Sequence, residues 1–312
     1  MRSQGRTVTV AVPVFNGERY LGEAIDSVLA QTQPSDHTLV FDNCSTDTTV
    51  PIATERLGAQ SVRTAHVNSG AVANFNRAAT ESPGEYFAWL AADDRLEERF
   101  VELTVGALEA APERAACLTG VRFIDDAGST IGSQRDPDLA SPHPRTRLRS
   151  MLRRGRWTEV YCMYRREALV ASPIFPPKYG ADVLLTWWFL LRGPLVVLPD
   201  LLLEYRVVAP RSRSEMAGAL LPGARQTHWR MLRLWADLWS AAAAPDLTRG
   251  VRWTARAELV LCLVGRHWLL HIGHDVRLRL YDATEPFPSA QRLLRRVEQA
   301  LRNRYRPNAV LP

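Results

Sequence analysis

The sequence predicts an α/β protein in which an open, mostly parallel sheet is flanked by helices and followed by a helical C-terminal extension. Apolar, β-branched segments alternate with segments of helical periodicity through the first part of the chain. Polar loops rich in Asp, Asn, Ser and Gly follow the apolar segments, as expected where the strands of a parallel sheet are followed by helices. Connections of this kind are right-handed.

The alternation begins with the apolar segment "TVTVAVPV" and continues to residue 111. The predicted strands are 7–14, 37–42, 61–66 and 83–92. The predicted helices lie within 16–32, after Asp47, near 70–80 and at 95–111. Asp47 is placed to cap the second helix, and Pro51 falls in its first turn, where a missing N–H costs little.

The pattern changes after residue 115. A turn at Asp125 to Gly128 between apolar segments predicts a hairpin. Further predicted elements are a short strand near 159–164, a helix at 181–193 and a last strand at 201–208. Beyond Pro210, helical patterns near 225–243, 247–271 and 288–303 predict a helical appendage with five tryptophans. The spacing of these tryptophans fits helix packing at least as well as stacking on sugars or bases.

The formal net charge is +6, and the positive excess lies at one end of the chain. Residues 1–210 carry a net charge of −3, whereas residues 211–312 carry +9. A basic C-terminal face suits anionic lipid, an acidic acceptor or nucleic acid, and a solvated helix face is the ordinary alternative. We expect no nucleic-acid partner, because the sequence lacks the interleaved aromatic and basic strand motif that RNA-binding folds use.

Features of cellular location are few. No apolar segment reaches the roughly 18 residues of a membrane-spanning helix, and the first residues lack the layout of a secretory signal. The four cysteines show neither metal-ligand nor redox spacing, so we expect buried thiols. We expect a cytoplasmic protein, and a peripheral contact of its basic C-terminus with the inner face of the membrane stays open.

Polar segments follow three of the predicted strands. These segments are Pro13 to Gly17, Asp42 to Asp47, and Asp93 to Asp94. Open α/β sheets bind ligands beyond the carboxyl ends of their strands. We therefore expect the three loops to open on the same edge of the sheet and to form one site.

Asp93 and Asp94 are adjacent carboxylates directly after an apolar segment, "YFAWLAA". They repel one another unless a cation or a set of donors compensates. Hard oxygen ligands of this kind suit Mg²⁺ or Mn²⁺, which take further ligands from water and substrate phosphate. An exposed acidic turn is the alternative.

Asp42 ends the second predicted strand, in "FDNCSTDTT". A carboxylate there can accept a hydrogen bond from the imide N–H of uracil or thymine, which cytosine lacks. The alternative is a cap for the following helix, a role for which Asp47 is better placed.

Together these segments resemble glycosyltransferase family 2, whose members have the GT-A fold. The resemblance covers about residues 7–208. It rests on "VAVPVFNGERYLGEAIDSVLAQT", "FDNCSTDTT", "NSGAVANFNRA" followed by "GEYFAWLAADD", and "YGADVLLTWWFLLRG" followed by "LLEYRV". Several spaced motifs in the right order are far more specific than any one of them.

The resemblance implies roles for individual residues. The residues implied to line the nucleotide pocket are Pro13, Phe15, Asn16, Glu18 and Asn76. Asp42 is implied to read the base, Asp93 to contact the ribose, and Asp94 to hold a Mn²⁺ or Mg²⁺ ion bound to the diphosphate.

Asp182, in "YGAD", occupies the position at which the family carries its catalytic Asp. Transfer needs a base that takes the proton from the acceptor hydroxyl. A carboxylate partly shielded by aromatic surface has a raised pKa, which favours base strength. The alternative role for Asp182 is the N-cap of a helix at 183–192, and the two roles can coexist.

The sequence departs from the family pattern in three places. Ala91 replaces the acid that commonly precedes the Asp pair, and Ala181 replaces the Glu that usually precedes the base. The segment "YRVVAPRSR" offers no His where many members have one. Arg206, Arg211 or Arg213 would then supply positive charge to the leaving diphosphate.

The sequence thus predicts a metal-dependent inverting glycosyltransferase with a nucleoside diphosphate sugar donor, UDP first and dTDP next. The acceptor would be a carbohydrate, a lipid-linked glycan or a small natural product. The alternative is a catalytically weak carbohydrate-binding or scaffold protein of the same fold. Residues 1–115 would be the nucleotide-sugar-binding half, 116–210 the acceptor half of the same domain, and 211–312 a basic, Trp-rich helical extension.

Overall fold

A computed structural model describes residues 6–154, 157–207 and 230–264 of the chain. The predicted helix at 288–303 lies outside these residues, as do Arg211 and Arg213. Within the described part, no helix is long and apolar enough to cross a membrane.

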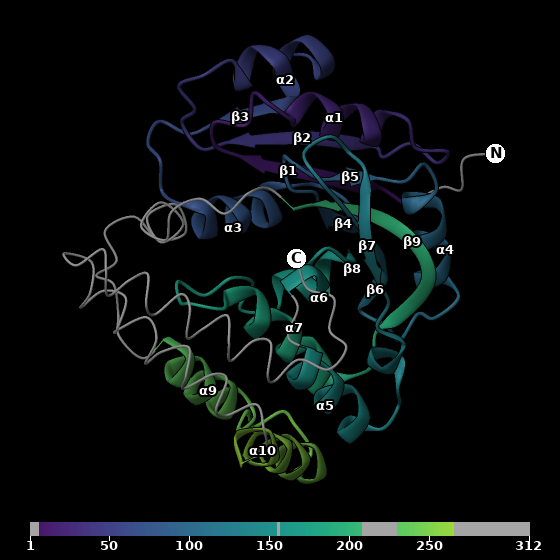
Figure 1. Cartoon of the computed structure of the whole chain (residues 1–312), viewed down its shortest axis with the longest axis vertical. Helices are drawn as coiled ribbons and strands as arrows, with labels where there is room; N and C mark the ends of the chain where they lie inside the picture. The colour runs from purple at the N-terminus through teal and green to yellow at the C-terminus, as the bar shows by residue number, and fades with distance from the viewer. Residues whose placement is uncertain (1–5, 155–156, 208–229, 265–312) are drawn as a thin grey trace, which may run out of the picture.

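The first half of the chain alternates strands and helices as predicted (Figure 1). Its strands are β1 Val8–Val14, β2 His37–Asp42, β3 Val62–Thr64, β4 Tyr86–Trp89 and β5 Arg95–Leu96. Its helices are α1 Leu21–Leu29, α2 Thr49–Leu57, the 3₁₀ turn η1 Ala59–Ser61, α3 Ala71–Glu81 and α4 Phe100–Glu109. Strands β3, β2, β1 and β4 lie side by side and pair in parallel, which places the ends of β1, β2 and β4 at one edge.

The second half extends the same sheet with mixed pairing. Its strands are β6 Ala116–Ile124, β7 Thr130–Gln134, β8 Met163–Arg165 and β9 Val196–Arg206. Its helices are η2 Pro137–Ala140, α5 Pro144–Arg154, η3 Trp157–Val160, α6 Arg166–Val170, α7 Ala181–Arg192, α9 Arg230–Ala241 and α10 Arg249–Val264. Strand β8 joins β4 to β6 in antiparallel fashion, and β6 pairs in parallel with β9. The sheet order β3-β2-β1-β4-β8-β6-β9-β5 is therefore continuous through both halves.

The sheet separates two apolar clusters. In β1, alternate side chains face opposite sides of the sheet, so Val10 and Val12 pack with α1 and α4, whereas Ala11 lies in the cluster of α3 and α7. Trp89, at the end of β4, is 1% exposed and contacts the rings of Phe87, Tyr164 and Phe175. Strand β4 is thus buried on both faces, as its apolar sequence predicts.

The C-terminal helices pack on the second of these clusters (Figure 1). The indole N–H of Trp187 in α7 donates to the carbonyl oxygen of Leu238 in α9 at 3.1 Å. Trp235 is buried, as core packing requires, but Trp239 and Trp253 are 42% and 73% exposed. The other two tryptophans of the appendage lie outside the described residues, and the proposed division at residues 115 and 210 stays a prediction.

The strand predicted near 159–164 begins only at Met163, because Trp157–Val160 forms the 3₁₀ turn η3. Two further sequence predictions need correction. The predicted helix at 95–111 begins only at Phe100, because Arg95 and Leu96 form the short strand β5 against Glu204 and Leu203 of β9. The last strand begins at Val196, five residues before the predicted start, where Cys117 of β6 lies opposite it in the ladder. Tertiary pairing, which local periodicity does not report, decides both boundaries.

The cysteines are free thiols in the described structure. Cys117, Cys162 and Cys262 are buried, which confirms the prediction for three of the four, and Cys44 is half-buried. Burial raises the pKa of the Cys117 thiol to about 12. These thiols therefore act as small apolar core groups.

We predict that Trp187→Phe lowers the free energy of unfolding by about 1–3 kcal/mol, because the smaller ring leaves a void and the Leu238 carbonyl loses a donor. Urea unfolding measures this. The matched control is Trp253→Phe on the exposed side of α10, where a change within about 0.5 kcal/mol is expected. Equal losses in the two variants would show that the contact between α7 and α9 does not stabilise the fold.

Candidate active site

The turn after β4 holds the two acidic residues that the sequence singles out. The Asp94 N–H donates to the carbonyl oxygen of Ala91 at 3.1 Å, which closes a tight turn around Ala92 and Asp93. Asp93 is half-buried, whereas Asp94 is only 1% exposed. The chain therefore turns one carboxylate inward and leaves the other nearer the surface.

Asp94 is held in an unusual state for a carboxylate. Its Oδ1 accepts the backbone N–H of Arg206 at 2.8 Å, but its buried Oδ2 has no hydrogen-bond partner. Burial, with the added charge of Asp93, raises the pKa of Asp94 well above its usual range, although the backbone N–H and the charge of Arg206 act in the opposite direction. An additional positive charge at this turn would therefore stabilise the ionised form.

Arg206 ends β9 and connects four parts of the site. Its Nε donates to the carbonyl oxygen of Asp93 at 2.9 Å, and its Nη1 donates to the carbonyl oxygens of Asp125 and Asp126 at 3.2 and 3.0 Å. Its Nη2 donates to Glu23 Oε2 of α1 at 2.7 Å. The guanidinium also lies over the ring of Tyr20, 4.3 Å from the centroid.

This environment differs from the expected role of Arg206. The side chain is 1% exposed, and all three guanidinium nitrogens already donate to the protein. A diphosphate contact would have to displace these bonds. The structure instead makes Arg206 the residue that positions the turn of Asp93 and Asp94 against β9, a role that its motif position alone did not indicate.

Asp182 is the second residue of α7. The residue before the helix is Gly180, which has a left-handed backbone conformation with φ of 73°, so Asp182 lies in the first turn and is not the N-cap. Its Oδ1 accepts the N–H of Val183 at 2.9 Å. Burial raises the pKa of Asp182 to about 6, although hydrogen bonds from the backbone N–H groups of Val183 and Asp182 act against this rise.

Tyr161 and Tyr205 connect the acidic residues of the two halves. The pKa of each tyrosine is raised, first by burial and then by the negative charges of Asp94, Asp93 and Asp182. The centroids of the two rings are 6.3 Å apart. Asp182 is therefore close enough to the β4 turn to act on the same side chains as Asp93 and Asp94. Sequence reasoning assigned no role to either tyrosine, although Tyr205 directly precedes Arg206 in the motif "LLEYRV".

The loops after β1 and β2 are joined by reciprocal hydrogen bonds. Asn16 donates its N–H to Ser45 Oγ at 2.8 Å and accepts the N–H of Thr46 on its side-chain oxygen at 2.9 Å. Glu18 donates its N–H to Asp47 at 3.1 Å, and its carboxylate accepts the N–H and hydroxyl of Thr48. Both Asn16 and Glu18 thus join the two loops at this edge of the sheet.

Asp47 acts on the first turn of α2, as predicted. Its Oδ1 accepts the N–H of Thr49 at 3.0 Å. Burial alone would raise the pKa of Asp47, but hydrogen bonds from Thr49 and from the N–H of Glu18 outweigh it and hold the pKa below the usual value. The cap is therefore an ionised carboxylate.

The remaining predicted pocket residues differ in accessibility. Pro13 is buried in β1, whereas Phe15 is 42% exposed at the sheet edge. Asp42 is fully buried, and both of its oxygens accept the N–H of Ser45 at 3.2 Å. The Asn76 side chain donates to and accepts from the backbone of Phe175, at 2.8 and 3.0 Å. In this structure Asp42 and Asn76 therefore support the loops, and base recognition by Asp42 would require its loop to open.

The carboxylates of the acidic turn supply some of the ligands that a divalent cation needs. Within residues 6–154, 157–207 and 230–264, no group of three or more His, Cys, Asp or Glu side chains is arranged to hold a metal ion. The unpartnered Oδ2 of Asp94 and the neighbouring carboxylate of Asp93 nevertheless supply adjacent hard oxygen donors. Such a pair fits Mn²⁺ or Mg²⁺ when the ion takes its other ligands from diphosphate and water.

The fold and the acidic site define a GT-A protein. Residues 9–171, just over half of the chain, match the family described as Glycosyl transferase family 2. The chain belongs to this family, which confirms the resemblance predicted from the motifs.

Curated relatives match segments of different lengths. A protein of Rickettsia typhi named as an uncharacterized glycosyltransferase is 35% identical over 125 residues, which are 40% of this chain and 39% of that protein. An uncharacterized glycosyltransferase of Nostoc sp. is 27% identical over 231 residues, which are 68% of each protein. For a relative from Rickettsia felis, the match covers only 21% of its length.

Solved structures show the same fold. TarS of S. aureus, residues 1–349 in complex with UDP, has a TM-score of 0.62 at 18% identity, with 97% of this chain and 94% of that chain covered. Glucosyl-3-phosphoglycerate synthase of Mycobacterium tuberculosis, in complex with Mn²⁺, UDP and phosphoglyceric acid, has a TM-score of 0.51 at 20% identity. That match covers 78% of this chain and 80% of that chain.

We predict that Arg206→Met lowers the free energy of unfolding by about 3–5 kcal/mol, because it removes a buried cation and leaves several carbonyl oxygens and Glu23 without their donor. The control is Arg19→Met, since Arg19 is 63% exposed and pairs with Asp126 from the solvent side. We expect a change of about 0–1 kcal/mol in the control. A loss in Arg206→Met no larger than in the control, measured by urea unfolding, would contradict the central position of Arg206.

Proposed function

We propose that this chain transfers a sugar from a nucleoside diphosphate donor to an acceptor hydroxyl, with UDP the first choice of nucleotide and dTDP the second. The observation that carries the proposal is the acidic turn after β4, where Arg206 holds Asp93 and Asp94 and one oxygen of Asp94 has no partner, together with Asp182 of α7, whose charge acts on the same two tyrosines as theirs. Carboxylates of unequal pKa at one site are suited to different tasks, charge binding and proton transfer.

The donor would bind at the edge formed by the ends of β1, β2 and β4. Binding of UDP by the structural neighbours TarS and glucosyl-3-phosphoglycerate synthase supports a uridine nucleotide. Asp94 would hold Mn²⁺ or Mg²⁺, which when bound neutralises charge on the diphosphate. Asp93 is the more exposed of the two, so we propose that it makes the ribose contact expected from the resemblance.

Asp182 would act as the base. Its carboxylate takes the proton of the acceptor hydroxyl while the hydroxyl oxygen attacks the anomeric carbon. The bond from this carbon to the diphosphate oxygen breaks, and the electron pair leaves with the nucleoside diphosphate. One displacement with one base inverts the anomeric configuration. A pKa of about 6 leaves Asp182 mostly ionised at neutral pH and still basic enough to accept the proton.

Glu204, the nearby alternative base, is less suited to proton transfer. Its two oxygens accept from Arg95 and Arg122, both at 2.7 Å. These charge-assisted bonds occupy both oxygens of the Glu204 carboxylate. Asp182, whose hydrogen bonds come only from the neutral backbone N–H groups of Val183 and of Asp182 itself among the described residues, is the better candidate.

A catalytically weak, carbohydrate-binding protein of the same fold is the alternative function. The observations in its favour are the absence of the usual acids at Ala91 and Ala181 and the full burial of Asp42. The two functions differ in turnover. Hydrolysis or transfer from a nucleotide sugar that depends on Asp182 excludes the binding protein.

We predict that UDP raises the melting temperature more with Mn²⁺ than with EDTA, because a ligand stabilises the state that binds it. The variant Asp94→Asn keeps an Oδ1 acceptor for Arg206 but loses the charge, so the metal-dependent part of the shift should disappear. A control variant, Glu102→Gln on the exposed surface of α4, should keep it. A UDP shift that is equal with Mn²⁺ and EDTA would contradict metal dependence, and an equal shift with CDP would contradict the choice of base.

We predict that Asp182→Asn lowers sugar transfer by about 10²–10⁴-fold and changes donor affinity by less than a few-fold, as expected for loss of a general base. The raised pKa also fixes the pH dependence. The base form of Asp182 is lost as pH falls through about 6, so wild-type transfer should fall about tenfold per pH unit below 6.

This acidic limb near pH 6 should be missing in Asp182→Asn. Glu204→Gln is a comparison variant, because Glu204 lies nearby without the proposed proton-transfer role. Wild-type turnover in Asp182→Asn, measured as release of nucleoside diphosphate, would place the base elsewhere. Because the pKa of Asp182 is higher in the folded than in the unfolded state, the ionised carboxylate lowers the free energy of unfolding at pH 8. Asp182→Asn removes this charge, so the variant should be no less stable than the wild type at pH 8.

A further inference from the structure

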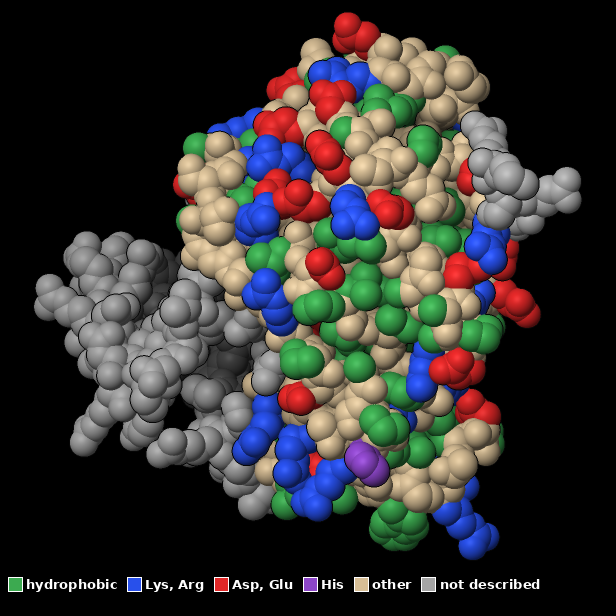
Figure 2. Space-filling view, turned by 90° about the vertical axis from the view of Figure 1, so that its right-hand side faces the viewer, with side chains coloured by type: hydrophobic (Ala, Val, Ile, Leu, Met, Phe, Trp, Pro, Cys, Tyr) green, Lys and Arg blue, Asp and Glu red, His purple; other side chains and the backbone are tan. Residues whose placement is uncertain are grey.

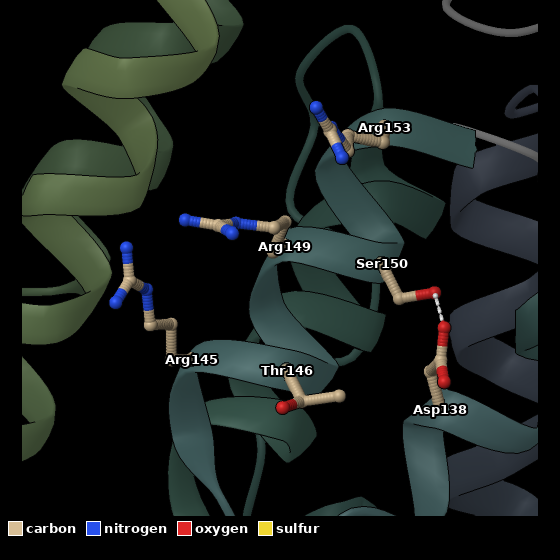
Figure 3. Close-up of a pocket in the computed structure, with 6 residues that line it drawn as sticks. All are labelled: Asp138, Arg145, Thr146, Arg149, Ser150 and Arg153. Atoms are coloured by element: carbon tan, nitrogen blue, oxygen red, sulfur yellow. Dashed lines mark hydrogen bonds between the residues drawn. The ribbon is translucent and has the colours of Figure 1, made fainter.

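A second charged region lies between α5 and α10, away from the acidic site. A pocket of about 460 Å³ opens there, lined by Asp138, Arg145, Thr146, Arg149, Ser150 and Arg153. Figure 3 shows Arg145, Arg149 and Arg153 on successive turns of α5, with Arg145 and Arg149 reaching toward α10 and Ser150 turned toward Asp138. The spacing of four residues places the three guanidinium groups on one side of the helix.

The positive charge of this pocket is only partly balanced. Glu258 of α10, with a side chain 4% exposed, accepts from Arg145 at 3.0 Å and from Arg149 at 2.7 Å. The Arg145 side chain is nevertheless 65% exposed. No hydrogen bond or ion pair joins Arg153 to another residue of the described ranges, and Asp138 accepts from Ser150 at 3.2 Å. Arg145 and Arg149 thus share one buried carboxylate of α10, and Arg153 takes no part in this pairing.

Exposed apolar side chains lie on the side of α10 that is turned away from Glu258. Trp253, Val260 and Leu261 are 73%, 44% and 51% exposed, and their spacing places them along one side of the helix. On α9, Trp239 is 42% exposed and lies under the guanidinium of Arg256, 5.1 Å from the ring centroid. Figure 2 shows Lys and Arg side chains close together at the lower end of the molecule, where Figure 1 places α5 and α10, with hydrophobic side chains exposed at the same end.

This surface does not overlap the acidic site. Helix α5 is fixed to the late part of α7 by Arg147, whose Nε donates to the carbonyl oxygen of Leu190 at 2.7 Å. Asp182 lies in the first turn of α7, about 12 Å away along the helix axis at 1.5 Å per residue. A ligand of the arginine pocket therefore needs no contact with Asp182, and the two can be tested separately.

We propose that α5 and α10 form a surface that binds an anionic lipid bilayer, with a lipid phosphate in the arginine pocket and Trp253, Val260 and Leu261 in the interfacial layer. Exposed arginines beside exposed tryptophan and aliphatic side chains are the combination by which helices lie on charged membranes. Charge complementarity selects the anionic headgroup, and the apolar row has no use with a soluble phosphate. Arginine forms bidentate bonds to phosphate oxygens, which suits the pocket to a headgroup.

The test is sedimentation of the full chain with vesicles of phosphatidylcholine, either alone or with about 30% phosphatidylglycerol. Binding should require the anionic lipid and weaken with salt, because exposed charges are screened. Arg153→Gln, which leaves both Glu258 pairs in place, should weaken binding about fivefold. Trp253→Ala should weaken it about tenfold through lost interfacial contact.

Two control variants make the same kinds of change elsewhere. Arg99→Gln removes an exposed arginine of the segment before α4, and Ile131→Ser removes an exposed aliphatic side chain of β7. Both should bind vesicles as the wild type does. Thermal unfolding of each variant confirms that the fold is retained, so that a loss of binding reports on the surface.

Three results would overturn the proposal. The first is equal binding to neutral and anionic vesicles, or none to either. The second is binding of soluble polyphosphate through Arg153 without vesicle binding, which would make the pocket a site for a soluble polyanion. The third is a dimer in analytical ultracentrifugation that Trp253→Ala dissociates while vesicle binding is unchanged, which would make the apolar row an interface between two copies.

Discussion

The geometry of the candidate active site depends on the hydrogen bonds of the buried guanidinium of Arg206. One side chain donates to the β4 turn, to the hairpin turn at Asp125 and Asp126, and to Glu23 of α1, while its backbone N–H holds Asp94. Asp94 and Arg206 are 112 residues apart in sequence. A buried cation without partners is very costly, so these bonds form together and fix the acidic turn relative to the end of β9.

This arrangement explains how two halves with different strand pairing produce one site. The parallel strands β1, β2 and β4 bring three loops to one edge, as sheet topology requires. The proposed base, however, comes from α7, which no strand pairing places. The negative charges of Asp182 and of the β4 turn nevertheless act on the same two side chains, Tyr161 and Tyr205.

Much of the fold follows from local sequence, and much of the site does not. The strand His37–Asp42 and the helix from Ala181 lie where their apolar patterns predict, because burial on one or two faces leaves a clear period. The role of Arg206 was not predictable, since its partners come from three separate segments. The hydrogen bonds of Asn16 and Asn76 with the backbone were not predictable either, because a motif gives residue types but not their hydrogen-bond partners.

Desolvation raises the pKa of both Asp94 and Asp182, but their surroundings suit them to different tasks. Asp94 is buried beside a like charge with one oxygen unpartnered, an arrangement that costs stability until positive charge arrives. Asp182 is half-buried, and partial desolvation raises its pKa to about 6, a rise that two backbone N–H groups partly offset. The first environment favours a ligand that carries a cation. The second preserves a carboxylate that is basic enough to accept a proton at neutral pH. Both follow from enclosing carboxylates with aromatic and apolar side chains at the ends of a strand and a helix, so the cost in folding stability is also the origin of the proposed activity.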